Sequence, residues 1–258
     1  MKQKTVASPV QVIERMMSLL DALARNDAPM NLKQLAAETS LHPSTAHRIL
    51  NAMTRNRYVD RIAHGSYRLG IRLFELGGLV HTRIGIRNVA LPYMQQLHQQ
   101  LGETVRLSIR LDERLVYVEH AHSGNQIDCN LQSIGATAPL HLTAAGKLFL
   151  ASESADYCAE YAKHIGLPST AEEASMDASG LLREIAAVRE LGYAYDGAEL
   201  GTAAAAVAAG INDESGAMIA ALCVSAPLER YNQMWASAVK QAAERISRAI
   251  GNPMDAAR

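Results

Sequence analysis

Residues 32–59 read LKQLAAETSLHPSTAHRILNAMTRNRYV, and residues 66–70 read SYRLG. Asn31 directly precedes the first segment as a good helix N-cap, and Gln34 three residues later can complete a capping box. A three-residue turn follows, and Pro43 is of a residue type favoured at the first position of a helix. The segment therefore predicts two helices joined by a short turn.

The second of these helices has two faces of opposite character. Ile49, Leu50 and Met53 recur at helical spacing and predict a buried face. The opposite face carries short hydrogen-bonding groups in its first turns and a basic group one turn later: Ser44, Thr45, His47, Arg48 and Asn51. A recognition helix needs this arrangement, because its first turns enter the major groove and its arginine reaches a guanine edge or a phosphate. These five residues are candidate DNA contacts.

A hairpin is predicted directly after this helix. Residues 58–61 and 67–69 are strand-like and flank a turn at residues 64–65, which is typical of a wing. Arg61 and Arg68 are its candidate phosphate contacts. A three-helix bundle with a β-ribbon and no role on DNA fits the same pattern, because any helical hairpin produces it.

The charge distribution favours the DNA-binding interpretation. Residues 1–90 hold 13 Lys and Arg against 6 Asp and Glu, whereas residues 91–258 hold 12 against 20. A basic segment attracts phosphate backbones and an acidic one is repelled by them. The two parts are therefore expected to have different partners, with the first third on the DNA.

The composition is typical of a soluble globular protein, with 48% apolar and 20% charged residues among 258. No segment resembles a signal peptide or reaches the ~20 apolar residues of a membrane span. The three cysteines, Cys129, Cys158 and Cys223, are widely spaced and form no CxxC pair. Reduced thiols in the cytoplasm are the expectation.

Helices and strands are mixed in the rest of the chain. Residues 12–23 predict an amphipathic helix ahead of the quoted segment, and residues 71–80 predict a helix interrupted by Gly77-Gly78. A helix begun near Pro92 is expected over residues 89–101, and residues 105–111 alternate strictly, as in a half-buried strand. Further helices are expected around 143–151, 155–164, 181–191 and 235–250, and strands at 115–118, 127–131, 193–195, 206–211 and 218–224. The mixture predicts an α+β sheet domain.

The sequence contains none of the common catalytic motifs, GxSxG, HExxH, the P-loop or GxGxxG, and no catalytic residue or cofactor is predicted. Asp196 and Glu199 are interpreted as surface acids, and Lys147 as a solvated charge on a helix. The pattern His120-Ala121-His122 places two imidazoles on one side of a strand, as in a metal-ligand pair. No third ligand stands at a telling spacing, with only His141 and Cys129 as candidates, and no metal site is predicted.

Residues 32–59 and 66–70 resemble the IclR family of bacterial regulators. The resemblance continues in order through GETV at 102–105, APLH at 138–141, AGK at 145–147, GY at 192–193 and VSAP at 224–227. It implies a winged helix-turn-helix over residues 8–70, a linker helix over 71–86 and a GAF-like α/β effector-binding domain over 87–251. It also implies a cytoplasmic homodimer or tetramer that binds a palindromic double-stranded DNA operator and a small-molecule effector.

The sequence departs from the family pattern at three places. The family usually has glycine where Arg57 stands, and Asn56 is the expected substitute in the left-handed conformation. The first helix carries Arg15-Met16 where the family has Arg-Gly. Residues 202–206 lack the family's Gly, Arg and Cys and hold Ala203, Ala205 and Ala206 instead.

The resemblance also implies the effector-binding residues. Those at matching positions are Ile127, Cys129, Asn130, Ala144, Ala145, Asp196, Ala206, Cys223 and Ser225. The backbone N–H groups of Ala144 and Ala145, near a helix N-terminus, can bind an anion, so a carboxylate metabolite is expected. Ordinary core packing is the alternative role for the alanines.

These observations together predict a DNA-binding transcriptional regulator that responds to a small molecule. Two other functions need features that the sequence lacks. An enzyme with a DNA-binding leader would need a catalytic constellation, and a nonspecific DNA binder would need basic residues throughout the chain.

Overall fold

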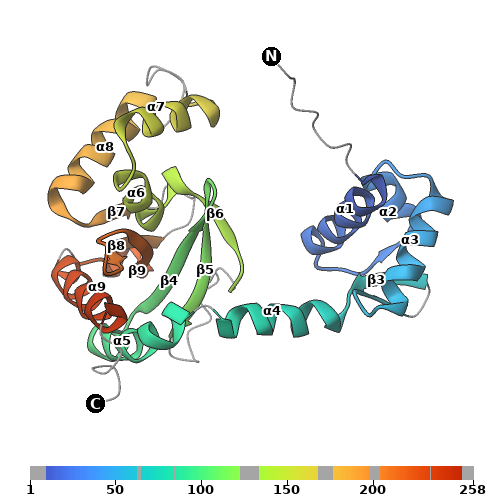
Figure 1. The fold of residues 1–258 in the computed structure, drawn as a ribbon, viewed down its shortest axis with the longest axis horizontal. Helices are drawn as coiled ribbons and strands as arrows, with labels where there is room; N and C mark the ends of the chain where they lie inside the picture. The colour runs from blue at the N-terminus through green and yellow to red at the C-terminus, as the bar shows by residue number, and fades with distance from the viewer. Residues whose placement is uncertain are drawn as a thin grey trace. The chain divides into compact units, whose positions relative to one another are not determined.

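The computed structural model describes residues 10–62, 65–83, 85–122, 134–167, 177–197, 204–232 and 234–251. The chain forms two compact units, Met1–Arg83 and Ile84–Arg258 (Figure 1). The first unit is helical with a small sheet, and the second is built on a larger sheet, so the predicted α+β class is confirmed.

The first unit consists of α1 (Gln11–Arg25), β1 (Met30–Asn31), α2 (Leu32–Glu38), α3 (Pro43–Arg55), β2 (Val59–Arg61), β3 (Ser66–Leu69) and α4 (Ile71–Arg83). The predicted capping box is confirmed: Asn31 accepts from the Gln34 backbone N–H at 3.0 Å, and the Gln34 side chain accepts from the Asn31 N–H at 2.8 Å. Pro43 begins α3 as predicted. Ile49, Leu50 and Met53 are buried against α1 and α2.

The predicted wing hairpin is confirmed, and it has one strand more than the sequence indicated. β2 and β3 pair antiparallel, and the two-residue β1 joins the other edge of β3 to give the order β1-β3-β2. Tyr67 and Val59 lie buried on the inner face of this sheet. The wing is thereby fixed to the helical core.

The expected role of Asn56 in the left-handed conformation was wrong. Asn56 has φ −94°, whereas Arg57 itself has φ 62°. The Arg57 carbonyl accepts from the Arg72 N–H, and Gly70 packs so close that an added Cβ would overlap that same carbonyl. The tight approach of the two backbone segments therefore sets the left-handed turn at position 57, whatever its side chain.

Helix α4 begins at Ile71, directly after Gly70, and runs unbroken through Gly77-Gly78. Glu75 pairs with Arg57 at 3.1 Å and with Arg72 at 2.9 Å, which ties the first turns of α4 to the end of α3. The glycines have open surroundings, since a Cβ on either would meet no atom within 4 Å. Packing therefore does not require glycine at these two positions.

The second unit consists of α5 (Gly85–Leu101), β4 (Thr104–Leu111), β5 (Arg114–Ala121), β6 (Thr137–Pro139), η2 (Leu140–Leu142), α6 (Ala144–Ala151), α7 (Ala155–His164), α8 (Ala178–Leu191), β7 (Ala194–Gly197), β8 (Ala204–Asn212), β9 (Met218–Pro227), η3 (Leu228–Arg230) and α9 (Trp235–Gly251). Helix α5 ends at Leu101 as predicted but starts four residues before the predicted Val89. The short elements β6, η2 and η3 were not predicted, and the other described helices and strands lie close to their predicted positions.

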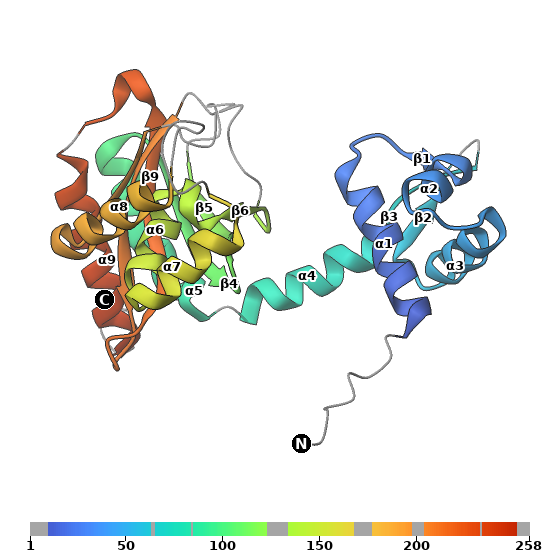
Figure 2. The same ribbon diagram turned by 90° about the horizontal axis from the view of Figure 1, so that it is seen from above.

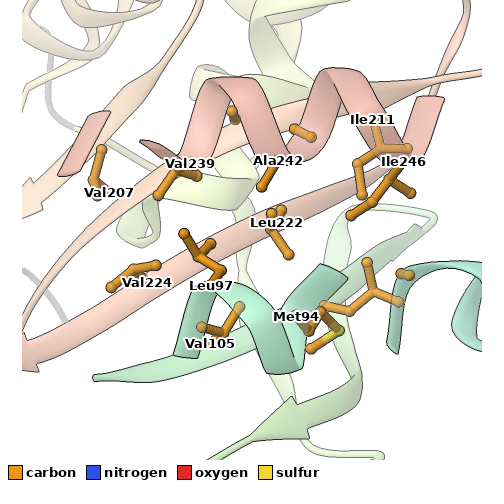
Figure 3. Packing of buried hydrophobic residues seen from close by; sticks show 14 of the residues in the cluster. Met94, Leu97, Val105, Val207, Ile211, Leu222, Val224, Val239, Ala242 and Ile246 are labelled. Atoms are coloured by element: carbon orange, nitrogen blue, oxygen red, sulfur yellow. The ribbon is translucent and has the colours of Figure 1, made fainter. Parts of the chain in front are cut away.

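The sheet of this unit has the order β6-β5-β4-β9-β8-β7, with every pair of neighbours antiparallel. Helices cover both of its faces (Figures 1 and 2): α5 and α9 pack on one, and α6, α7 and α8 on the other. On the first side, Leu97 of α5 and Val239 of α9 meet Leu222 and Val224 of β9 (Figure 3). The two layers of helices bury most residues of the central strands β4, β9 and β8.

The predicted alternation of β4 is present, but its interpretation as a half-buried strand was wrong. Val105 and Leu107 point toward α5 and α9. Thr104, Arg106 and Ser108 point to the opposite face, which α6 and its neighbours cover. A polar strand face that the pattern assigns to solvent therefore lies inside the domain.

Candidate DNA interface and effector pocket

The predicted DNA contacts of α3 lie on one exposed strip of the helix. At 3.6 residues per turn, Ser44, His47, Arg48 and Asn51 share the side opposite the buried face. Ser44, His47 and Arg48 are exposed and Asn51 is half-buried. The Asn51 amide lies 3.3 Å from the His47 ring. The strip combines donors and acceptors with one long cation, as groove recognition requires.

Two further residues of α3, Thr45 and Arg55, lie beside this strip or extend it. Thr45 lies at its flank and is half-buried, so its hydroxyl is less accessible than that of Ser44. Arg55 was missed by the sequence reasoning. It is exposed and lies one turn beyond Asn51 on the same side of α3. The spacing of seven residues between Arg48 and Arg55 was the sequence feature that could have identified Arg55 as a member of the strip.

The two predicted arginines of the wing lie on opposite faces of the hairpin. Arg61 pairs across the strands with Tyr67, and its guanidinium carbon lies 5.9 Å from that ring. Arg68 pairs with Asp60, whose carboxylate lies 3.5 Å from its guanidinium. A phosphate at Arg68 would have to compete with Asp60, whereas Arg61 has no such competitor among the ion pairs of the described chain.

In the second unit, three of the implied effector residues form one row across the sheet. Asp196 of β7 pairs with Ala206 of β8, which pairs with Ser225 of β9. Directly opposite residues in an antiparallel sheet point to the same face. Cys223 lies in the next row and faces α6. Four residues that are distant in sequence thus share one surface under the helix.

Helix α6 covers this surface with its first turn. Thr143 is the N-cap and accepts from the Gly146 N–H at 3.0 Å, while Ala144 and Ala145 are buried. A Cβ on Gly146 would overlap the Leu140 backbone, so α6 packs in direct contact with η2. The helix N-terminus is therefore held inside the domain, where its partial positive charge is poorly screened.

Two predictions about charged residues were wrong. Asp196 is 6% exposed and not a surface acid. Lys147 is 1% exposed and not a solvated charge, and its ammonium lies 2.7 Å from the Glu184 carboxylate. The sequence could not distinguish these cases, because α6 and β7 are buried by segments distant along the chain.

Arg106 is a further residue of this surface that the sequence reasoning missed. Its backbone pairs with Cys223, so its side chain points to the face that α6 covers. The guanidinium carbon lies 5.7 Å from the centre of the Tyr117 ring, within cation–π range. The alternation of β4 places Arg106 on the polar face of the strand. The sequence pattern, however, predicted that this face meets solvent.

The acidic groups around Arg106 stay protonated at neutral pH. Burial raises the pKa of the Cys223 thiol to about 12, against a smaller lowering by Arg106. Burial also raises the pKa of the Tyr117 phenol to about 12, and the neighbouring Cys223 and Asp196 act in the same direction, against a lowering by Arg106. Both groups therefore offer neutral hydrogen-bond donors rather than charges.

Some predicted positions lie outside the described residues. Ile127, Cys129 and Asn130 are among them, as are Ala203 and Glu199. Within the described residues, no three His, Cys, Asp or Glu side chains gather as a group that could hold a metal ion. None of the described helices combines the length and apolar character that a membrane span requires.

Comparison with known proteins matches both units to one family. The model of the IclR helix-turn-helix domain matches residues 12–63, and that of the bacterial transcriptional regulator IclR C-terminal domain matches residues 79–250. The chain is 30% identical to an uncharacterized HTH-type transcriptional regulator of Haemophilus influenzae over 97% of this chain and 96% of that protein. It is 25% identical to the transcriptional repressor IclR of Escherichia coli over 94% of this chain and 90% of that protein.

A solved structure supports the same relationship. An IclR homolog from Microbacterium hydrocarbonoxydans, complexed with 4-hydroxybenzoate, superposes with a TM-score of 0.78 at 25% identity. The match covers 93% of this chain and 98% of that one. The similarity therefore extends over both units.

Proposed function

The chain belongs to the IclR family of bacterial transcriptional regulators, and from this premise we propose that it binds a specific operator through α3 and that a small carboxylate modulates this binding. Like its curated relatives, it is a regulator and not an enzyme. The observation that carries the proposal is the exposed strip of Ser44, His47, Arg48 and Asn51, which stands on a winged helix-turn-helix with a buried opposite face.

The proposed functional boundaries are those implied by the resemblance: DNA binding in residues 8–70, a linker in 71–86 and effector binding in 87–251. Operators of such proteins have two half-sites, so a homodimer or tetramer is the proposed binding form. Linking two winged domains raises the effective concentration at the second half-site. Light scattering on the purified chain measures the oligomeric state, and a monomer at micromolar concentration would contradict this part.

The first test is operator binding by the full chain. Fluorescence anisotropy with DNA from upstream of the gene should detect binding. Random competitor DNA should displace this bound DNA only poorly. Arg48→Ala should reduce the preference for the operator over random DNA. Arg25→Ala is the matched control, because it removes another exposed arginine, one that lies at the end of α1 and pairs with Glu38 at 3.1 Å. Equal affinity for operator and random DNA in the wild-type chain would overturn the proposal.

The second test is effector binding. The buried residues Asp196, Ser225 and Cys223, together with the N–H groups of Ala144 and Ala145, support a pocket for a small acid under α6. A ligand at a hundredfold excess over its Kd stabilises the folded state by about 2.7 kcal/mol. A panel of small carboxylates should therefore contain acids that raise Tm and change operator affinity. A rise in Tm without any change in operator affinity would separate binding from regulation.

A further inference from the structure

A cleft of about 740 Å³ follows the outer edge of strand β7 in the second unit. In the described sheet, β7 is the last strand and pairs with β8 on its inner side. Val188, which lines the cleft, packs into the core beneath α6, whereas Tyr193 and Tyr231 pack against the core beneath α5 and α9. The cleft therefore passes around the sheet edge from one helical layer to the other. Its volume lies within the range of about 300–1,000 Å³ that is usual for small-molecule pockets.

This cleft is distinct from the surface implied for the effector. Successive residues of a strand point to opposite faces, so Tyr195 and Gly197 point away from the face that carries Asp196. Among the described residues that line the cleft, none belongs to the implied effector-binding set. A molecule bound here would therefore occupy a second site of this unit, beyond the proposed effector pocket.

One wall of the cleft is a single face of α8. Glu184, Ala187, Val188 and Leu191 recur at spacings of three and four residues, which places them on the same side of the helix. Ala187 and Leu191 are exposed, whereas Val188 is buried. Gly192 ends the helix in the left-handed conformation, and the chain then turns directly into β7. Beyond Glu184, this wall is therefore an accessible aliphatic surface beside the strand.

A second wall of the cleft is aromatic. The rings of Tyr195 and Tyr231 have centres 4.7 Å apart, and Tyr231 meets Trp235 edge-on at 5.8 Å. A Cβ at Gly197 would come 3.1 Å from the Tyr195 hydroxyl, so this ring lies along the strand over the glycine. Burial raises the pKa of the Tyr231 phenol, which therefore stays uncharged at neutral pH. An aliphatic wall together with an aromatic one suits an apolar side chain.

A buried ion pair lies in the same cleft. Lys147 of α6 is 1% exposed, and its ammonium lies 2.7 Å from the carboxylate of Glu184, whose side chain is 44% exposed. A ligand with a single charge would compete with one partner of the pair for the other. A ligand with both charges side by side can align them against Lys147 and Glu184 without separating the pair. Such an alignment is strengthened by the low polarity around a buried charge.

We propose that this cleft binds an α-amino acid with a large apolar side chain, its carboxylate lying at Lys147 and its ammonium at Glu184. The two charges of such a molecule are attached to one carbon atom, so their separation is similar to that of the ion pair. The apolar side chain packs on the surface formed by Ala187, Leu191 and Tyr195. Burial of that side chain adds affinity that glycine would lack.

Trp235 can report binding at this cleft, because it is the only tryptophan of the chain and its ring meets that of Tyr231. The full chain is titrated with phenylalanine and with leucine while tryptophan fluorescence is followed, and both should change the signal. Phenylpropanoate lacks the ammonium, phenethylamine lacks the carboxylate, and glycine lacks the side chain. Each should bind about 10- to 100-fold more weakly, as expected for the loss of one charge-assisted hydrogen bond or one buried side chain.

Glu184→Gln should reverse part of this preference. The amide removes the countercharge that Glu184 provides for Lys147, and it no longer attracts the ammonium of the ligand. Phenylpropanoate should therefore bind the variant better than the wild-type chain, because its carboxylate can take the place of the Glu184 carboxylate. Phenylalanine should lose its advantage over phenylpropanoate. A gain of binding of this kind would not arise from misfolding.

Ala187→Phe fills the cleft, and Ala186→Phe is its matched control. Both alanines are exposed on α8, but consecutive residues stand about 100° apart around a helix, so Ala186 points away from the cleft-lining face. Ala187→Phe should abolish the fluorescence response, and Ala186→Phe should keep it.

Three results would overturn the inference. They are a response that survives Ala187→Phe, single-charge analogues that bind as well as phenylalanine, and no response to either amino acid at millimolar concentration. Small carboxylates should shift the Tm of the Ala187→Phe variant as they shift that of the wild-type chain, because the two sites are distinct. Failure of the amino-acid site would therefore leave the proposed function standing.

Discussion

Helix α3 and strand β4 each carry a polar face opposite an apolar one, but the two polar faces lie in different surroundings. On α3, the face with His47 and Arg48 is exposed. On β4, the face with Arg106 and Ser108 is covered by helices. Both segments are amphipathic in sequence, so the periodicity alone does not say which polar face meets water. An exposed polar face suits a large charged partner such as DNA, whereas a covered one suits a small ligand.

The packing of α6 can be disturbed at Gly146. Gly146→Ala places a methyl group on the Leu140 backbone and on Thr143 Oγ1, so the first turn of α6 must shift against η2. We expect a loss of about 1–3 kcal/mol in the stability of the second unit, together with loss of acid binding. Urea unfolding followed by circular dichroism measures the first effect, and thermal shift the second. Retained acid binding would mean that the position of α6 is unimportant for the pocket.

The exposed face of α3 should respond differently from the wing. Arg48→Ala is expected to weaken operator binding by about 1–3 kcal/mol if Arg48 reads a base. Arg61→Ala should weaken all DNA equally and reduce the salt slope by about one unit, as for a phosphate contact. Both variants should unfold within about 0.5 kcal/mol of the wild-type chain, since neither arginine is buried. If Arg48→Ala weakens binding to all DNA sequences equally, Arg48 contacts the phosphate backbone and not a base.

Communication between the two regions is expected to depend on α4. Replacing Gly77 and Gly78 with alanine should stabilise the helix by about 1 kcal/mol each, because the space around both is open. If these glycines provide a flexible coupling point, the double variant keeps its affinity for operator DNA and for acids but loses the effect of the acid on the operator. Anisotropy titrations with and without acid measure this coupling. An unchanged response would exclude that role.

The smallest effect is expected at Arg57. Its left-handed conformation is unfavourable for a residue with a side chain, by about 1–2 kcal/mol, and glycine recovers part of this. Arg57→Gly also loses an exposed ion pair with Glu75, which is worth little. We expect a net gain of about 0.5 kcal/mol in the stability of the first unit by urea unfolding. Arg57→Ala keeps the strain and loses the ion pair, so it should bring no gain.

The sequence by itself determined most local structure, since capping, turns and periodicity act over a few residues. The capping box at Asn31, the start of α3 at Pro43 and the wing hairpin followed from neighbours in the chain. The polar strip of α3 was predictable for the same reason. The family resemblance supplied Asp196 and Ser225, which local pattern could not bring together.

Only the tertiary structure decided which polar groups are buried. Asp196 and Lys147 look like surface charges in sequence but are buried, and Arg106 is half-buried on a strand face that pairs with Cys223. The left-handed turn at Arg57 likewise depends on the backbone of Gly70. Burial is a property of long-range packing. Because burial also determines whether a charge is solvated or directed at a ligand, the character of the effector pocket emerged only with the fold.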